Sequence, residues 1–254
     1  MARRTPEGPP PPPVVQRVRL RYAKRGRLRF ASHRDFARAF ERALRRAEVP
    51  MAYSAGFSPH PRISYVGAAP MGTASEAEYL EIGLAREVDV EQLRAALDAA
   101  LPAGLDIVAA VLAGPGSLAD RVQASAWRIE LPGVPVAAAA AAVAAFLARD
   151  EVAVERLTKT GRKQLDARGA VVRLAVSDGT GGPSEPERAI LDLVVRQVTP
   201  AVRPDDVLTA LRIVAGLALD VPPLAVRLAQ GPLDDAGVVG DPLSLDRDMP
   251  ENAP

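Results

Sequence analysis

The 254-residue sequence contains no cysteine, two histidines and one tryptophan, and aromatic residues make up only 4% of it. Without thiolates the chain can form no disulfide, hold no iron–sulfur cluster through its own side chains and build no cysteine-type zinc site. The longest apolar run, residues 134–148, is too short to cross the ~30 Å hydrocarbon core of a bilayer. The Arg- and Pro-rich start also lacks a secretory signal pattern. These absences predict a soluble cytoplasmic protein with a core of Ala, Val and Leu.

Motifs of several common enzyme classes are also missing. The sequence has no Walker A phosphate loop, no Gly-x-Gly-x-x-Gly turn after a strand, no Gly-x-Ser-x-Gly elbow and no His-Glu-x-x-His pair. The glycines at residues 179–182 lie between two predicted strands with no helix start after them, so we interpret them as a loop. We therefore expect no cofactor and no metal ion, and we lean against an enzyme.

The charge that is present is unevenly distributed. Residues 1–62 hold fifteen Arg and Lys against four Asp and Glu, whereas the rest of the chain has more acidic than basic residues. Such a split favours an anionic partner for the N-terminal part. The alternative is that the basic part pairs with the chain's own acidic part.

Much of this positive charge falls on a segment that alternates Arg with apolar residues at positions 17–22 and 27–30, with Lys24-Arg25-Gly26 between. A period of two predicts a β-hairpin with one apolar face and one Arg face. Guanidinium groups held together need a counter-charge, and phosphate matches their planar fork. The alternative is neutralisation by acidic neighbours. In particular, we expect Glu76, Glu78 and Glu81 to form salt bridges to these arginines rather than a paired-carboxylate acid–base site.

An amphipathic helix and a proline-braced loop follow the basic segment. Ser32 and Asp35 have the spacing of a helix cap, and an apolar stripe then runs to residue 47. In the loop at residues 53–62, prolines at 59 and 61 restrict the backbone and hold it extended. We expect this loop to present Phe57 for base stacking and Arg62 for a phosphate.

Both histidines lie in this region. Basic residues beside His33 favour the neutral ring, the form that can act as a general base on RNA. Alternatively, His33 hydrogen-bonds the helix entry or the loop. A metal pair formed by His33 and His60 is disfavoured, because only Asp35 offers a nearby carboxylate.

The order of elements predicts an α+β fold of two tandem ferredoxin-like βαββαβ halves with disordered Pro-rich termini. The first half has predicted helices at 33–47 and 89–101. The second has predicted helices at 136–148 and 204–217, and a polar segment at 158–168 between strands. The predicted boundaries are a disordered lead-in at 1–14, a basic half at 15–112, a linker at 113–120, a second half at 121–230 and an acidic disordered tail at 231–254.

Several segments together resemble a known family. They are the Ser32-His33-x-Asp35 run, residues 41–47, the Ser-x-Gly-Phe-x-Pro-x-Pro loop at 54–61, and residues 72–80. Their joint spacing resembles the radical-SAM-associated domain of unknown function over roughly residues 15–230. Residues 159–168 resemble a Lys-rich segment of that family more loosely. Gln164 stands where an acidic residue is common there, and Arg34 where Leu is common.

The resemblance implies no established activity. Relatives occur alone or fused to radical SAM modules, often encoded beside a ribonuclease E/G-type protein, which implies a link to RNA metabolism. This chain has no Cys-x-x-x-Cys-x-x-Cys triad, so it cannot itself be the radical enzyme.

Our leading hypothesis is an RNA-binding accessory protein, not catalytic by itself, that is associated with tRNA or rRNA processing or modification. One alternative is a protein-docking module for a radical SAM or ribonuclease partner. Another is a metal-independent ribonuclease with His33 as its catalytic base. The predicted RNA contacts are Arg17, Arg19, Arg21, Arg27, Arg29, Ser32, His33, Arg34, Ser54, Gly56, Phe57, His60, Arg62, Lys159, Arg162 and Lys163.

Overall fold

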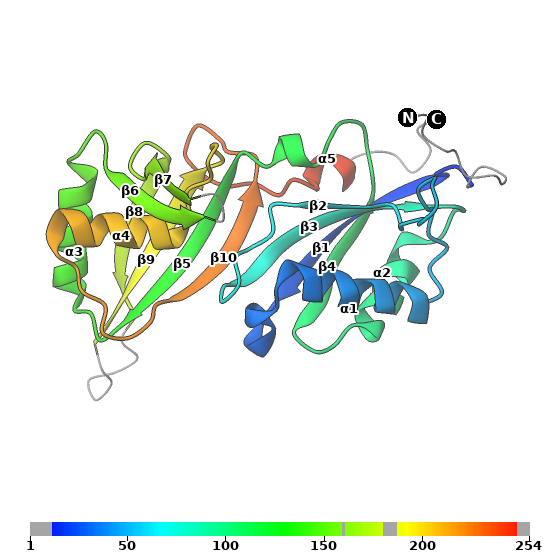
Figure 1. Ribbon diagram of the computed structural model, residues 1–254, viewed down its shortest axis with the longest axis horizontal. Helices are drawn as coiled ribbons and strands as arrows, with labels where there is room; N and C mark the ends of the chain where they lie inside the picture. The colour runs from blue at the N-terminus through cyan, green and yellow to red at the C-terminus, as the bar shows by residue number, and fades with distance from the viewer. Residues whose placement is uncertain (1–11, 159–160, 180–186, 248–254) are drawn as a thin grey trace. The chain divides into compact units, whose positions relative to one another are not determined.

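A computed structural model describes residues 12–158, 161–179 and 187–247 (Figure 1). The chain divides into two compact units, one formed by residues 1–120 with 243–254 and the other by residues 121–242. Both combine helices with antiparallel strands, so the fold is α+β with a mainly sheet core, and the described residues hold five α-helices. None of these helices is both long and apolar enough to cross a membrane.

The first unit is a sheet with two helices on one face (Figure 1). Its strands lie in the order β4-β1-β3-β2, and all their pairings are antiparallel. In chain order its elements are β1 (Gln16–Lys24), the 3-10 helix η1 (Gly26–Phe30), α1 (His33–Arg46), β2 (Ile63–Val66), β3 (Ala74–Leu84), α2 (Val90–Ala100), β4 (Leu105–Leu112) and α5 (Ser244–Arg247).

The apolar face predicted for the first strand forms the core of this unit. Leu20 of β1 pairs with Leu80 of β3, and both side chains are fully buried against α1. The rings of Tyr22 and Phe36 stack with centroids 4.2 Å apart. Burying each such side chain contributes about 1.5–3 kcal/mol, so the strand and helix patterns stabilise one another. The arginines of β1 therefore lie on the opposite face of the sheet.

The predicted hairpin over residues 17–30 is wrong. Its first arm is β1, but residues 26–30 form η1, and β4 from much later in the chain pairs with the free edge of β1. Gly26 turns the chain with a φ of +53°, and Leu28 then packs on the core. Four alternating residues are too few to distinguish a strand from a short 3-10 turn with one inward side chain.

The second unit has a four-stranded antiparallel sheet in the order β10-β5-β9-β8 and a separate β6–β7 ladder. Helices α3 and α4 pack on its sheet, with Trp127, Phe146, Leu191 and Leu211 in the core. Its elements are β5 (Ala124–Pro132), α3 (Val136–Leu147), β6 (Ala153–Thr158), β7 (Gly161–Asp166), β8 (Val171–Asp178), β9 (Arg188–Arg196), α4 (Pro204–Ala215) and β10 (Leu224–Gly231). The 3-10 helix η2 (Ala119–Arg121) precedes them. The polar segment at 158–168 thus contains a strand, β7, that we did not predict.

The predicted disordered tail is ordered over residues 231–247. Leu233 bridges to Val239, Leu243 is fully buried, and α5 returns to the first unit. Composition misled the prediction, because one buried Leu and one buried carboxylate anchor an otherwise polar segment. The remaining parts of the predicted termini, residues 1–11 and 248–254, lie outside the described residues.

Candidate nucleic-acid interface

Arg19 lies at the centre of the Arg-bearing sheet face and is only 1% exposed. Its Nε donates a hydrogen bond to Glu81 at 2.9 Å, and its Nη1 donates to both carboxylate oxygens of Asp246 at 2.9 and 3.0 Å. Burial alone would lower the pKa of Arg19, but these hydrogen bonds outweigh it and the pKa is raised. The guanidinium is therefore charged, satisfied and inaccessible, so Arg19 is a structural residue and not an RNA contact.

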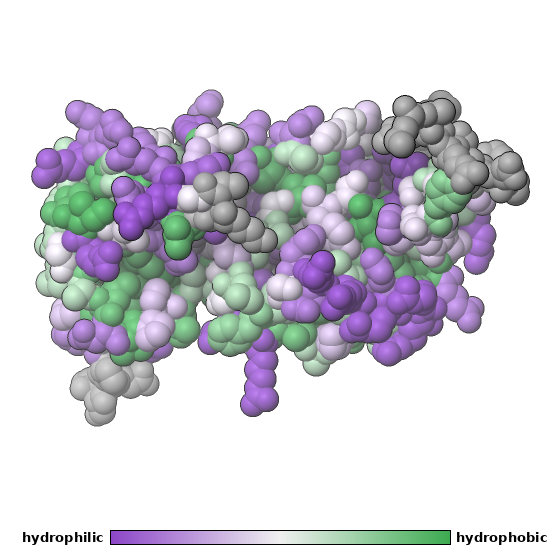
Figure 2. Space-filling view, viewed as in Figure 1, coloured by the Kyte–Doolittle hydropathy of each residue, from purple (hydrophilic) through white to green (hydrophobic). Residues whose placement is uncertain are grey.

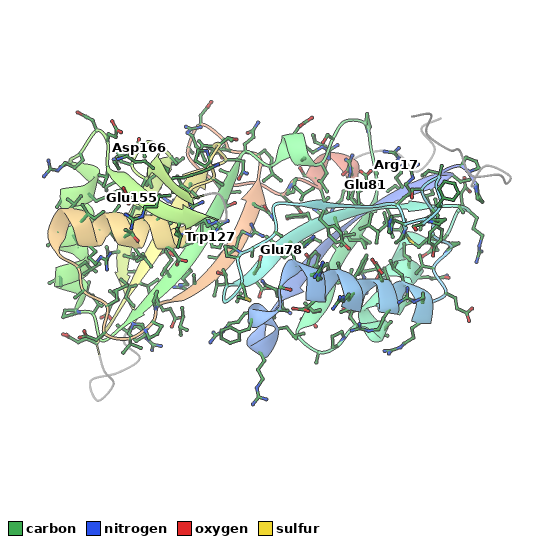
Figure 3. The ribbon with its side chains drawn as sticks, in the orientation of Figure 1. Arg17, Glu78, Glu81, Trp127, Glu155 and Asp166 are labelled. Atoms are coloured by element: carbon green, nitrogen blue, oxygen red, sulfur yellow. The ribbon has the colours of Figure 1, made fainter. Side chains whose placement is uncertain are left out.

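The neighbouring arginines are also used within the fold. Arg17 lies 3.4 Å from Glu81, and the two side chains lie side by side on adjacent strands (Figure 3). Arg21 donates to the backbone carbonyl of Glu76 at 2.8 Å. Arg25 pairs with Glu76 and with Asp106. Hydrogen bonds from Arg25 hold the pKa of Glu76 below its usual value.

The expectation of salt bridges from the acidic strand is confirmed for Glu76 and Glu81. Glu78 is 2% exposed, and its carboxylate accepts a hydrogen bond from the backbone N–H of Ala69 at 2.9 Å. The second set of arginines, on η1, does not join this sheet face. Arg27 is exposed, whereas Arg29 is half-buried with its guanidinium 4.8 Å above the Phe30 ring. The five arginines therefore do not form one phosphate-binding surface.

The accessible positive charge lies instead on α1. Five arginines on this helix are exposed, and none forms a salt bridge within the described ranges: Arg34, Arg38, Arg42, Arg45 and Arg46. Of these, Arg46 also donates a hydrogen bond to the backbone carbonyl of Ala100 at 3.0 Å. Figure 2 shows the corresponding hydrophilic band over α1. Only two acidic residues belong to the helix, Asp35 and Glu41. We call these five arginines the α1 basic face.

Asp35 offsets the charge of this face only in part, because its hydrogen bonds are made at the helix start. It forms the predicted capping box with Ser32, whose hydroxyl lies 2.6 Å from the carboxylate. Hydrogen bonds from Ser32 lower the pKa of Asp35, with smaller contributions from Arg38 and Arg34. Four members of the α1 basic face, at positions 38, 42, 45 and 46, were not among the predicted contacts. Their three- and four-residue spacing was the signal that could have identified them.

The loop at 53–62 is closed at its neck rather than extended. Tyr53 bridges to Pro61, and Ser54 exchanges hydrogen bonds with His60 at 2.8 and 3.0 Å. Gly56 has a φ of +131°, which favours glycine, and Phe57 beside it is 72% exposed. The loop thus exposes Phe57 to solvent, and its predicted role in base stacking stays a prediction.

Arg62 lies beyond the neck, on the other face of the sheet from α1. It lines a hollow with Arg17, Ser64 and Glu81, while the adjacent Ile63 packs on the core beneath α1. The predicted contacts Arg17 and Arg62 are therefore brought together, but away from the α1 basic face.

The two histidines lie near opposite ends of α1, His33 as its first residue and His60 in the loop beside its C-terminal half. His33 is exposed at the helix start, where its ring meets that of Tyr65 edge-on with centroids 4.6 Å apart. Burial, and then the charge of Glu41, raise the pKa of Tyr65 to about 12. His60 lines the same hollow as Arg45, and position 45 is roughly 18 Å along the helix from position 33. The histidines therefore cannot form an acid–base pair, and no group of three or more metal-binding side chains occurs among the residues described.

The remaining predicted contacts belong to the second unit. Arg162 and Lys163 are exposed on β7, and Arg162 lies 3.3 Å from Glu155. Lys159 lies outside the described residues.

These observations define a two-unit α+β protein whose first unit carries an exposed basic helix. Its sequence matches, over residues 17–204, a family described as "Uncharacterized protein conserved in bacteria (DUF2344)", and the chain belongs to this family. No curated protein matches the sequence. A solved structure described as an unknown protein from Galdieria sulphuraria is 15% identical, and the match covers 84% of this chain and 98% of that chain with a TM-score of 0.24. At this level the similarity says nothing about function.

Proposed function

We propose that the first unit binds RNA through the α1 basic face and the neighbouring loop, as an accessory to tRNA or rRNA processing or modification. The observation that carries this proposal is the row of five exposed arginines without salt bridges among the described residues. Residues 34 and 46 are about 18 Å apart along the helix, a span that can follow several successive phosphates. The planar guanidinium fork suits phosphate oxygens, and Phe57 offers a flat ring for an unpaired base.

The proposal assigns the sheet arginines a different role from the one the sequence suggested. Arg19 and Arg21 hold the fold together, whereas the helix provides the polyanion contact. His33 has one described ring neighbour, Tyr65, and lies far from His60, so the ribonuclease alternative has little support.

We also infer that each unit is a ferredoxin-like half. The first unit has β1-α1-β2-β3-α2-β4 in chain order and the sheet order β4-β1-β3-β2, which supports this assignment. The second unit has the corresponding arrangement of β5, α3, β8, β9, α4 and β10, with the β6–β7 ladder as an insertion. The motifs at residues 32–35 and 54–61 support kinship to the radical-SAM-associated domain, and a radical SAM or ribonuclease E/G-type protein is the proposed partner.

RNA binding can be tested by filter binding of bulk tRNA to the full chain. If the five arginines each neutralise one phosphate, log K should fall with log salt with a slope of about −3.5 to −4.5. The affinity should then drop about a hundredfold or more between roughly 50 and 200 mM salt. Absence of binding at low salt would refute the proposal.

A charge-matched pair of variants locates the surface. The triple variant R38Q/R42Q/R45Q should weaken binding and make the salt slope shallower by about 2 to 3. The control R149Q/R196Q/R212Q removes the same charge from exposed positions of the second unit. Equal losses in both variants would show that net charge, and not the α1 basic face, determines binding. A protein complex that survives nuclease treatment would favour the docking alternative.

A further inference from the structure

A hollow lies between the C-terminal half of α1 and the loop at 53–62. Its floor is apolar, with Leu44 and Met51 buried at 3% and 8% exposure and two proline rings beside them. Polar groups surround the opening: Glu41, Arg45, Tyr53 and His60. The cavity measures about 190 Å³, which is below the roughly 300–1,000 Å³ of sites for drug-sized molecules. It therefore suits one planar ring system rather than a whole nucleotide.

We propose that this hollow receives a single nucleobase of an unpaired RNA nucleotide, while the α1 basic face holds the adjoining phosphates. This inference rests on the proposed RNA binding and adds a base-recognition pocket to it. Tyr53 supplies a flat aromatic surface for the base, as in single-strand recognition generally. The proline rings add apolar contact beside it. Arg45 belongs both to the opening of the hollow and to the basic face, so it links base and phosphate.

The polar groups at the opening predict which bases fit best. Glu41 and Arg45 are one helical turn apart and both line the hollow, so a carboxylate acceptor and a guanidinium donor lie on the wall that α1 provides. An ionised carboxylate accepts two parallel N–H donors well. Guanine presents two such donors side by side on its Watson–Crick edge, whereas uracil presents one. We expect guanine to be preferred over uracil.

The loop is built to hold the hollow open before any ligand arrives. Hydrogen bonds between Ser54 and His60 close its neck, and the prolines at 59 and 61 restrict the backbone around His60. A preformed wall lowers the entropy lost on binding. Phe57 at the loop tip does not line the hollow, so it provides a control for aromatic stacking outside the pocket.

The test uses the full chain and three decamers of abasic ribose phosphate units, followed by fluorescence anisotropy. One is fully abasic, one carries a single central uridine, and one carries a single central guanosine. The guanosine decamer should bind about 5- to 150-fold more tightly than the abasic one, the range for one stacked base. Tyr53→Ala should remove most of this difference and leave the salt slope unchanged. Glu41→Ala should abolish the preference for guanosine over uridine.

The outcomes separate this inference from the proposed function. Equal affinity for the guanosine and abasic decamers, with a steep salt dependence, would refute the pocket and leave RNA binding intact. If Phe57→Ala removes the difference and Tyr53→Ala does not, the base stacks at the loop tip and the pocket is again refuted. If no decamer and no tRNA binds at low salt, both proposals fail. Glu41 is half-buried and Tyr53 is 42% exposed, so neither substitution removes a core side chain. A thermal melt checks that each variant is folded.

Discussion

The buried ion pair between Arg19 and Asp246 gives the sharpest prediction about stability. Asp246 is 5% exposed and accepts hydrogen bonds from Arg19 and from the backbone N–H of Gly114 at 3.0 Å. The variant Asp246→Asn keeps the shape of the side chain but removes its charge from beside a buried guanidinium. Removing one partner of a buried pair typically costs about 3–5 kcal/mol. Because Arg19 retains Glu81, we expect the lower end, about 3 kcal/mol.

Such a loss is large against a total stability of about 5–15 kcal/mol. It can be measured by urea unfolding monitored by far-UV circular dichroism. Trp127, the single tryptophan, belongs to the second unit, so its fluorescence follows that unit separately. If the units unfold independently, the part of the circular dichroism transition that comes from the first unit should shift, and the fluorescence transition should not.

The control is Asp235→Asn, which makes the same charge change at an exposed position in the same segment. It should alter the free energy of unfolding by no more than about 0.5 kcal/mol. If Asp246→Asn is as mild as this control, α5 does not anchor the first unit and the role assigned to Arg19 is wrong.

Three further predictions concern the helix cap, the response to acid and a tight backbone contact. Ser32→Ala should lower the free energy of unfolding by about 1 kcal/mol through loss of the α1 cap. Ser54→Ala, which removes a hydroxyl from the loop neck, should lower it less, and thermal melts of the two variants compare the losses. The pKa of Glu76 is lowered because Arg25 donates hydrogen bonds to it, so its ionised carboxylate stabilises the fold at pH values above its ordinary pKa of 4.5 and this stabilisation is lost as the pH falls through the lower folded pKa. Glu76→Gln should therefore reduce the free energy of unfolding at neutral pH and flatten its fall below pH 4.5. An unchanged acid-unfolding profile would contradict this prediction. Gly231→Ala would drive a methyl group into the backbone carbonyl oxygen of Gly240, so it should destabilise the second unit by about 1–3 kcal/mol. Gly179→Ala instead meets side-chain atoms of Ile190 at 2.7 Å, with no backbone atom closer than 3.1 Å, so it should cost less.

The sequence predicted those features that depend on nearby residues. The capping box at Ser32 and Asp35, the apolar stripe of α1 and the helix observed as Val90–Ala100 each follow from patterns within about four residues. Alternation also assigned Arg17, Arg19 and Arg21 to one face of a strand correctly. The order of strands and helices in the first unit could be predicted for the same reason.

The errors arose where a distant part of the chain determines the outcome. β4 is more than eighty residues away from β1 in sequence, yet it occupies the edge that we assigned to Arg27 and Arg29. The partner of Arg19 is 227 residues away, in a segment whose composition resembles disorder. A local pattern shows which way a side chain points, but it does not show what lies opposite.

The same distinction explains why the exposed positive charge lies on a different element from the one that the sequence suggested. An arginine on a sheet face can be covered by the next strand's glutamates and by a returning segment, as Arg19 is by Glu81 and Asp246. An amphipathic helix packed on one side of a sheet keeps its opposite stripe in solvent, because its apolar stripe already faces the core. Alternating arginines in a strand are therefore an ambiguous sign of a binding surface. Arginines spaced three and four apart on a helix with a strong apolar stripe are the better sign, and this is why we propose α1 as the RNA-binding surface.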